Sequence, residues 1–184
     1  MNKYIITGGA CTGKTAIIDR LFDRGYFVVN EVARDLISEE KLKKEKFPDY
    51  NPILPQTDLL AFQYLVIQRQ LNLEKSIDSD VSFLDRSLVD SIAYCNVGDC
   101  SLGDFLLDLI SSANYSKVFY LESLPFYETD SHRQESLGER ELVHKELFQV
   151  YTSLGFEVVR VPFFETDTKD ESIDKRVDYV LQRL

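Results

Sequence analysis

The chain has 184 residues, of which 44% are hydrophobic and 28% charged, a composition that fits one globular domain around one sizeable core. Its net charge of −10 argues against a duplex nucleic-acid partner, because that affinity depends largely on Lys and Arg side chains that neutralise phosphates. No run approaches the ~18 apolar residues of a membrane helix and the N-terminus has no signal-peptide pattern, so we expect a cytoplasmic protein without a membrane partner.

The first predicted element is a short apolar strand at residues 4–6, and a glycine-rich loop follows it. This loop matches the phosphate-binding pattern G-x-x-x-x-G-K-[ST] with Gly8, Gly9, Ala10, Cys11, Thr12, Gly13, Lys14 and Thr15. Apolar residues at helical spacing come next, so backbone N–H groups and the positive end of a helix would face an anion. Lys14 would contact the β- and γ-phosphates, and the Thr15 hydroxyl would bind Mg²⁺. The sequence therefore predicts a nucleoside triphosphate site.

Strands and helices alternate along the rest of the chain. Gly25 ends the first helix, a strand is expected at 26–29, and a helix at 31–46 carries a charged run at 39–46 that we interpret as a solvated face. Prolines mark residues 47–55 as a loop, and a long helix should follow at about 57–76. Further strands are predicted at 81–84, 117–121 and 157–161, and further helices at about 87–96, 102–113, 139–154 and 172–183. This order predicts a single α/β domain, residues 1–184, with a mostly parallel sheet covered on both faces.

The cysteines give no sign of a disulfide or a metal centre. Cys11, Cys95 and Cys100 are an odd number in a chain too long to depend on disulfides. Cys95 and Cys100 lack the second pair or nearby histidine that would complete a zinc site. We expect reduced thiols in the core or at the surface.

Charged residues follow the predicted strands, at the carboxyl edge where sheets of this kind bind ligands. Asp85, after the third strand, would bind Mg²⁺, directly or through water, or activate a substrate hydroxyl; the structural alternative is a helix cap. Glu31, after the second strand, would accept a proton from an attacking hydroxyl or only favour the helix dipole. Arg34 would pair with Glu31 or hold an anionic substrate. Arg86 would bind substrate or phosphate, or form a salt bridge.

The polar connection at about 125–140 has the character of a lid that closes over a transferring phosphate. Arg133 is the first candidate for an arginine that neutralises the transferred group, and Arg140 is the second. The alternative for either is an exposed arginine without a role. His132 and His144 look exposed, and we assign them no function.

A few other side chains have open interpretations. Phe163 and Phe164 follow the last strand, where an aromatic ring would pack on a nucleobase or in the core. The polar residues of the long helix would line an acceptor pocket or form the polar face of an amphipathic helix; they are Gln63, Gln68 and Arg69.

Together these motifs resemble the small AAA-type ATPases related to the ribosylnicotinamide kinase domain of the bacterial NAD regulator and, more broadly, P-loop nucleoside and nucleotide kinases. The resemblance rests on residues 6–15, 31–34, 85–87, 120–121, 125, 130–133 and 151–162. It implies a three-layer fold whose five-stranded parallel sheet has the order 2-3-1-4-5, with a lid and an acceptor pocket near the long helix. It also implies that Asp85 works with magnesium and that Glu31 acts as a base or holds the substrate. Residues 38–55 show no nucleoside-binding signature, and the guanine motif N-K-x-D is missing, so we expect ATP rather than GTP.

Two functions fit these observations. The first is a kinase that transfers the γ-phosphoryl group of ATP to a small metabolite, with a nucleoside-like molecule among the acceptors. The second is a regulatory ATPase switch that hydrolyses ATP and signals to a protein partner. Association of the chain with itself is compatible with either function.

Overall fold

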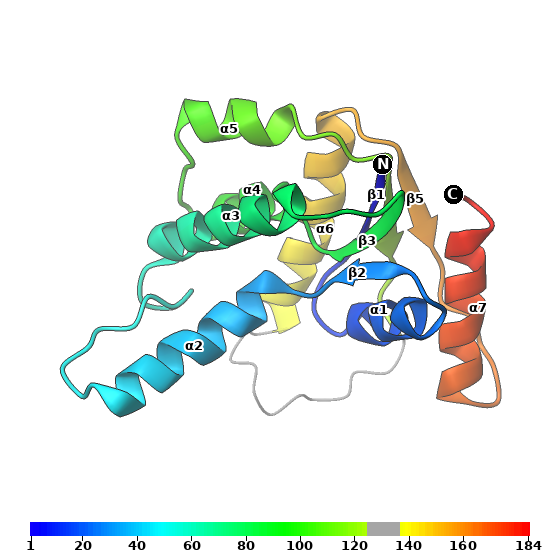
Figure 1. The fold of residues 1–184 in the computed structure, drawn as a ribbon, viewed down its shortest axis with the longest axis horizontal. Helices are drawn as coiled ribbons and strands as arrows, with labels where there is room; N and C mark the ends of the chain where they lie inside the picture. The colour runs from blue at the N-terminus through cyan, green and yellow to red at the C-terminus, as the bar shows by residue number, and fades with distance from the viewer. Residues whose placement is uncertain (125–136) are drawn as a thin grey trace.

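A five-stranded parallel sheet forms the centre of the protein, and the computed structural model describes residues 1–124 and 137–184. The strands are β1 (Asn2–Thr7), β2 (Phe27–Val29), β3 (Val81–Asp85), β4 (Lys117–Leu121) and β5 (Val158–Val161), in the order β2-β3-β1-β4-β5. Ile6 of β1 lies beside Asp85 of β3 and Phe119 of β4, and every pairing is parallel. The expected α/β fold and strand order are therefore confirmed. The central strand leads straight into the glycine-rich loop (Figure 1).

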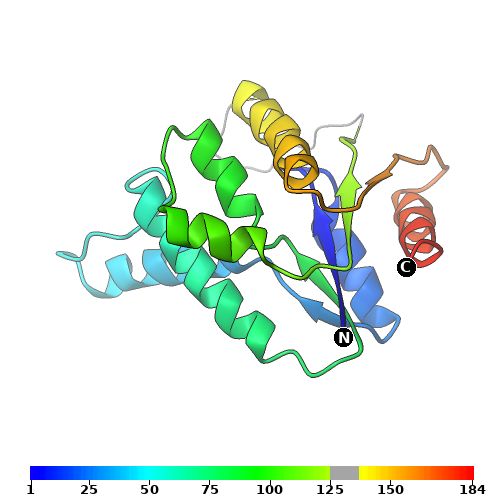
Figure 2. The ribbon, with the colours of Figure 1, turned by 90° about the horizontal axis from the view of Figure 1, so that it is seen from above.

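Helices cover both faces of the sheet (Figures 1 and 2). On one face lie α1 (Lys14–Asp23) and α7 (Lys169–Leu181). On the other lie α3 (Leu59–Lys75), α4 (Asp90–Val97), α5 (Asp104–Ser111) and α6 (Leu137–Ser153). α2 (Val32–Lys46) extends from the sheet and packs along α3. The described part of the chain thus forms three layers, with the sheet between two layers of helices.

The sheet divides the main core into two clusters because successive side chains of a strand point to opposite faces. Tyr4 and Ile6 of β1 pack toward α1 and α7, whereas Ile5 packs toward α3 to α6. All three side chains are buried, as expected for a parallel strand covered on both faces. The two clusters together fix β1, and with it the start of the glycine-rich loop.

A third, small cluster joins α2 to α3, and a buried charge lies next to it. Val32 and Leu36 of α2 contact Phe62 of α3. Glu40, only 2% exposed, accepts hydrogen bonds from Tyr50 Oη at 2.6 Å and from Ile53 N at 2.8 Å, and it pairs with Lys43. The interpretation of residues 39–46 as one solvated face is therefore wrong at Glu40. A buried carboxylate needs hydrogen-bond partners, and this one holds the loop after α2 in place.

Local signals account for some of the helix ends. Asp58 caps α3 by accepting a hydrogen bond from Ala61 N at 2.9 Å, and Gly25, with φ of +88°, follows the end of α1. The prediction placed the last helix at 172, but Thr168 caps α7 earlier by accepting from Glu171 N. The cysteines are thiols, as expected, and Cys95 is buried.

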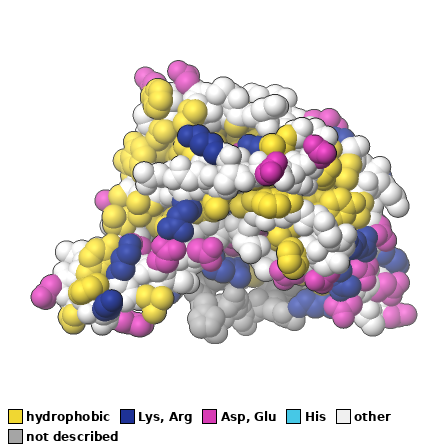
Figure 3. Space-filling view, viewed as in Figure 1, with side chains coloured by type: hydrophobic (Ala, Val, Ile, Leu, Met, Phe, Trp, Pro, Cys, Tyr) yellow, Lys and Arg dark blue, Asp and Glu magenta, His cyan; other side chains and the backbone are white. Residues whose placement is uncertain are grey.

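The exposed charges of α1 and α7 pair with one another. Arg20 of α1 and Arg24, directly after α1, reach Asp174 of α7 at 3.2 and 3.3 Å, and Arg24 also reaches Asp178 at 2.5 Å. Figure 3 shows the acidic and basic side chains intermixed at this side of the molecule. Among the described helices, none has the length and apolar character needed to cross a membrane.

Candidate functional site

The loop between β1 and α1 has the geometry of an anion-binding site. Gly8 and Gly13 have φ values of +143° and +87°, which residues other than glycine rarely adopt. Because α1 begins at Lys14, its first amides and the positive end of its dipole face the loop. The Lys14 ammonium donates hydrogen bonds to Gly8 O at 3.0 Å and to Gly9 O at 2.7 Å. The predicted loop residues thus lie together with their lysine folded over them.

Gly8→Ala is expected to disrupt this loop. A Cβ at position 8 would lie 2.8 Å from the backbone oxygen of Leu121 and 3.1 Å from Thr12 Oγ1. We expect a loss of about 2 kcal/mol in the free energy of unfolding, measured in urea, and a roughly tenfold loss of nucleotide affinity, measured by calorimetry.

Gly25→Ala is the matched control for this substitution. Gly25 also has a positive φ, +88°, but no described heavy atom lies within 4 Å of the position of its Cβ. This control should lose only about 1 kcal/mol of stability and keep its nucleotide affinity. Equal effects of the two substitutions would contradict the predicted clash at Gly8.

Two side chains from opposite layers hold the glycine-rich loop. His144 of α6 accepts a hydrogen bond from Gly9 N through Nδ1 at 2.9 Å. Arg176 of α7, 2% exposed, donates from Nη1 to Thr12 O at 2.6 Å. Its other hydrogen bonds go to backbone oxygens at the carboxyl ends of two strands: Glu122 directly follows β4, Val161 is the last residue of β5, and Pro162 follows it. Arg176 therefore ties the carboxyl ends of β4 and β5 to the loop.

Sequence reasoning missed both of these residues. His144, expected to be exposed and without a role, is partly buried and contacts the loop, so that expectation is wrong. Arg176 stands in a charged helical segment and gives no sign in the sequence that it is buried. Burial lowers the pKa of Arg176 to about 10, which still leaves it protonated at neutral pH. Only the packing of α6 and α7 against the sheet reveals either contact.

Beside the loop, the carboxyl ends of β2 and β3 bring Glu31, Arg34, Asp85 and Arg86 together. Arg86 Nε donates to Glu31 Oε1 at 2.9 Å, and Arg34 Nη2 lies 3.6 Å from Glu31 Oε2. Glu31 thus lies between two guanidinium groups. Arg34 pairs with Glu31, and Arg86 forms a salt bridge with it, as two of the sequence-based alternatives expected. The Arg34 side chain remains about half exposed, at 53%.

Asp90 holds Arg86 from the other side. Its Oδ1 accepts from Arg86 Nη1 at 3.1 Å and from Thr7 Oγ1 at 2.8 Å, while its Oδ2 accepts from Tyr151 Oη at 2.5 Å. Arg86 itself has a left-handed backbone, with φ of +73°, and its amide donates to Ile6 O. This buried network fixes the Arg86 side chain against Glu31. Asp90 was not a predicted site residue, because an aspartate in the first turn of a helix is common.

Asp85 is a buried carboxyl group with an unsatisfied oxygen. Its residue exposure is 3%, and its Oδ1 has no hydrogen-bond partner among residues 1–124 and 137–184. The capping alternative does not apply, because Asp90 Oδ2 accepts from Ser87 N and Ser87 Oγ accepts from Val89 N at the start of α4. A buried oxygen of this kind requires a partner that a ligand would supply.

The surroundings separate the pKa values of the two carboxyl groups. Burial raises the pKa of Asp85 to about 6, against the positive charge of Lys14 and with the help of the negative charge of Glu31. Burial also opposes ionisation of Glu31, but Arg86 and Lys14 outweigh it and lower the pKa of Glu31 to about 2. Glu31 is therefore ionised and only weakly basic at neutral pH, whereas Asp85 binds a proton more readily.

The other predicted residues divide into three groups. Arg140 lies at the start of α6, and its buried Nε has no partner in the described part of the chain. Arg133 and His132 lie outside the described residues. Phe164 packs against Tyr179 of α7, with 5.8 Å between the ring centroids. This contact agrees with the alternative in which the ring packs within the protein.

The polar residues of the long helix do not share one environment. Gln63 is buried, at 4% exposure, and does not belong to an exposed polar face, whereas Gln68 is exposed. Arg69 pairs with Glu39 of α2 at 2.9 Å. The amphipathic interpretation therefore applies to Gln68 and Arg69 only.

Comparison with known proteins agrees with this geometry. The family described as AAA domain matches residues 3–170, which is most of the chain. The chain belongs to the AAA domain family. No curated protein matches the sequence of this AAA domain.

Solved structures share the fold of the AAA domain at low sequence identity. Thymidylate kinase from Ehrlichia chaffeensis is 15% identical with a TM-score of 0.66, over 99% of this chain and 97% of that one. Deoxyadenosine kinase from M. mycoides with bound dATP is 16% identical with a TM-score of 0.65, over 97% and 100%. NadR protein in complex with NR is 17% identical with a TM-score of 0.68, over 98% of this chain and 51% of that one. The AAA domain therefore spans about half of the NadR chain.

Proposed function

We propose that this AAA domain binds ATP with Mg²⁺ and transfers the γ-phosphoryl group to a hydroxyl group of a small, nucleoside-like metabolite. The observation that carries the proposal is the buried Asp85 carboxyl group, whose Oδ1 is unsatisfied among the described residues, at the sheet edge where Arg86 contacts both Glu31 and Gly8 of the phosphate loop. Water as the acceptor would not require an ionised glutamate clamped by two arginines. The similar folds of the solved kinases support the proposal by analogy.

Thr15 and Asp85 are the residues proposed to hold Mg²⁺. Asp85 fits this role because its buried Oδ1 lacks a partner and its carboxyl group would ionise beside a cation. In sites of this class, Mg²⁺ takes most of its ligands from phosphate and water rather than from the protein. When bound, the ion would neutralise charge on the triphosphate.

Glu31 is proposed to orient the acceptor hydroxyl. In the transfer, the acceptor oxygen bonds to the γ-phosphorus, the bond to the β–γ bridging oxygen breaks, ADP leaves, and the hydroxyl proton passes to a carboxylate or to water. Because the transition state is loose, placement of the hydroxyl matters more than the strength of the base. An ionised Glu31 held by Arg86 and Arg34 fits that requirement, and the Arg34 side chain is exposed enough to contact an acceptor as well.

Cations are proposed to stabilise the transferred group. Lys14 would leave the carbonyls of Gly8 and Gly9 for the β- and γ-phosphates. Arg133 remains the first candidate for a further cation, and Arg140, with its unsatisfied buried Nε, is the second. We also propose a cytoplasmic setting and a small-molecule acceptor. The net charge of −10 argues against a nucleic-acid partner.

The test is a screen for acceptors. The AAA domain, with Lys14→Met as the inactive control, is incubated with Mg²⁺, ATP and single nucleosides, nucleoside monophosphates or ribosylnicotinamide, and products are read by mass spectrometry. We expect one acceptor class to gain a phosphoryl group and to accelerate ADP release. ADP release that no acceptor changes would instead support the regulatory ATPase.

A further inference from the structure

His144 contacts the glycine-rich loop at its most adaptable point. Gly8 and Gly9 are adjacent residues without a Cβ, and such a pair has more backbone freedom than any other dipeptide. His144 Nδ1 accepts the Gly9 amide hydrogen at 2.9 Å, and a Cβ on Gly9 would lie only 2.8 Å from His144 Cβ. The helix that carries this histidine therefore lies directly against the loop backbone.

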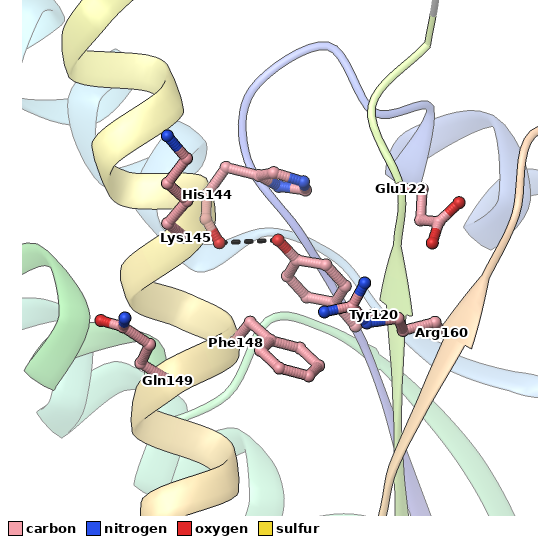
Figure 4. Close-up of a pocket in the computed structure, with 7 residues that line it drawn as sticks. All are labelled: Tyr120, Glu122, His144, Lys145, Phe148, Gln149 and Arg160. Carbon is pink, nitrogen blue, oxygen red and sulfur yellow. Dashed lines mark hydrogen bonds between the residues drawn. The ribbon is translucent and has the colours of Figure 1, made fainter.

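The imidazole ring is itself held in place. It stacks on the Tyr120 ring with a centroid distance of 4.7 Å, and Tyr120 Oη donates to the His144 backbone oxygen at 2.8 Å. Phe148, one helical turn after His144, packs against the same tyrosine, and the Arg160 guanidinium lies 4.3 Å from the Phe148 ring. Figure 4 shows these side chains from α6, β4 and β5 around one open pocket of about 320 Å³. The ring position is thus set by the core rather than by the loop.

The charge state of His144 suits an acceptor. Burial and the positive charges of Lys14 and Arg160 lower the pKa of His144 to about 4, so the ring is neutral at pH 7. Because Nδ1 accepts the Gly9 hydrogen, the remaining ring proton is assigned to Nε2.

The hydrogen bond fixes the peptide groups that position Lys14. Gly9 O accepts from Lys14 Nζ at 2.7 Å and from Thr12 Oγ1 at 3.0 Å. Gly9 is therefore held at its N–H by α6 and at its C=O by the loop and the lysine. Without the acceptor on α6, the peptide between Gly8 and Gly9 would be held only at the Gly8 carbonyl, by Lys14 and Arg86, and the loop would lose more conformational entropy when a ligand ordered it.

We propose that His144 is a positioning residue of the nucleotide site, which holds the Gly9 peptide in the orientation that binds the triphosphate. The proposal rests on the proposed ATP binding and deepens it. It also makes α6, which follows the expected lid, a direct support of the phosphate loop. His144 also lines the open pocket next to Tyr120 and Phe148, so close packing does not surround it on every side.

Two substitutions separate the hydrogen bond from the ring. His144→Phe keeps an aromatic ring over Tyr120 but has no acceptor, whereas His144→Asn places an amide oxygen near the position of Nδ1. Affinity for Mg²⁺–ATP, measured by calorimetry, should fall about tenfold in H144F and should largely recover in H144N. The KM for the acceptor should change little in either variant, because the acceptor side contains Glu31 and Arg34.

A spectroscopic measurement tests the contact itself. In ¹⁵N-labelled protein, an N–H···N hydrogen bond gives a scalar coupling between Gly9 N and His144 Nδ1, which should be present in the wild type at pH 7. H144F that binds ATP as tightly as the wild type, or a missing coupling, would overturn the proposal. Failure of the wild type itself to bind ATP would refute the proposed function and leave the coupling as a separate result.

Discussion

Asp85→Asn is expected to lower turnover by roughly a thousandfold, because it removes the carboxylate proposed to hold Mg²⁺ against the transferred phosphate. The fold should tolerate the change. The wild-type carboxyl group is buried with an unsatisfied oxygen, so its ionised form destabilises the protein at neutral pH. Single-turnover kinetics at saturating ATP would measure the loss in the chemical step, and thermal unfolding would show whether the fold is retained.

The sign of the pH effect follows from the direction of the Asp85 pKa. The pKa of Asp85 is raised to about 6 in the folded protein, so burial costs stability above that pH and costs progressively less as the pH falls toward the unfolded value. Asp85→Asn should therefore gain stability relative to the wild type at pH 8 and less at pH 5. Asp108→Asn, at an exposed position of α5, is the matched control and should leave turnover unchanged. Turnover near the wild-type level in Asp85→Asn would remove Asp85 from the mechanism.

Arg176→Met is expected to destabilise the protein by about 3 kcal/mol, because four buried or partly buried backbone oxygens would lose their donor. The loss stays below the sum of the separate hydrogen bonds, since removing a buried charge also removes its desolvation cost. Nucleotide affinity should fall as well, because Thr12 O is one of those acceptors. Urea unfolding and ATP calorimetry on the same preparation would measure both effects.

Arg24→Met is the control for that experiment. Arg24 also joins α1 to α7, but it does so at the surface, where ion pairs contribute at most about 1 kcal/mol. Arg176→Lys keeps the charge but cannot reach several carbonyls in one plane, so its stability should lie between those of the wild type and Arg176→Met. An Arg176→Met variant as stable as Arg24→Met would show that the buried guanidinium is dispensable.

The fold could be predicted largely from the sequence because its signals are local. The Gly8 to Thr15 pattern, the helix cap at Asp58 and the apolar strands each act through neighbouring residues. The strand order came from the resemblance to P-loop kinases, and the family match and the sheet topology confirm it. Several element ends differ from the predicted ones by a few residues, and α7 begins earlier than predicted because the cap at Thr168 was overlooked.

The site could be predicted only in part, for a physical reason. Glu31, Arg34, Asp85 and Arg86 follow strands, so the direction of a parallel sheet brings them to one edge. His144 and Arg176 come from helices packed on opposite faces, and their contacts depend on which face of each helix meets the sheet. Glu40 could not be predicted as buried for the same reason, because the charged run at residues 39–46 gives no sign that one of its side chains is buried. Long-range contacts of single polar side chains have no periodicity that a sequence could display.

The small cluster of Val32, Leu36 and Phe62 is separate from the two clusters that enclose the sheet. Segments that share few apolar contacts with the main core open with less free energy than the core itself. We therefore expect α2 and the loop tied to Glu40 to unfold locally, or to accept substitutions, while the glycine-rich loop keeps its structure. If Glu31 and Arg34, at the start of α2, hold the acceptor as proposed, substitutions in this helix would alter the choice of acceptor with little effect on ATP binding.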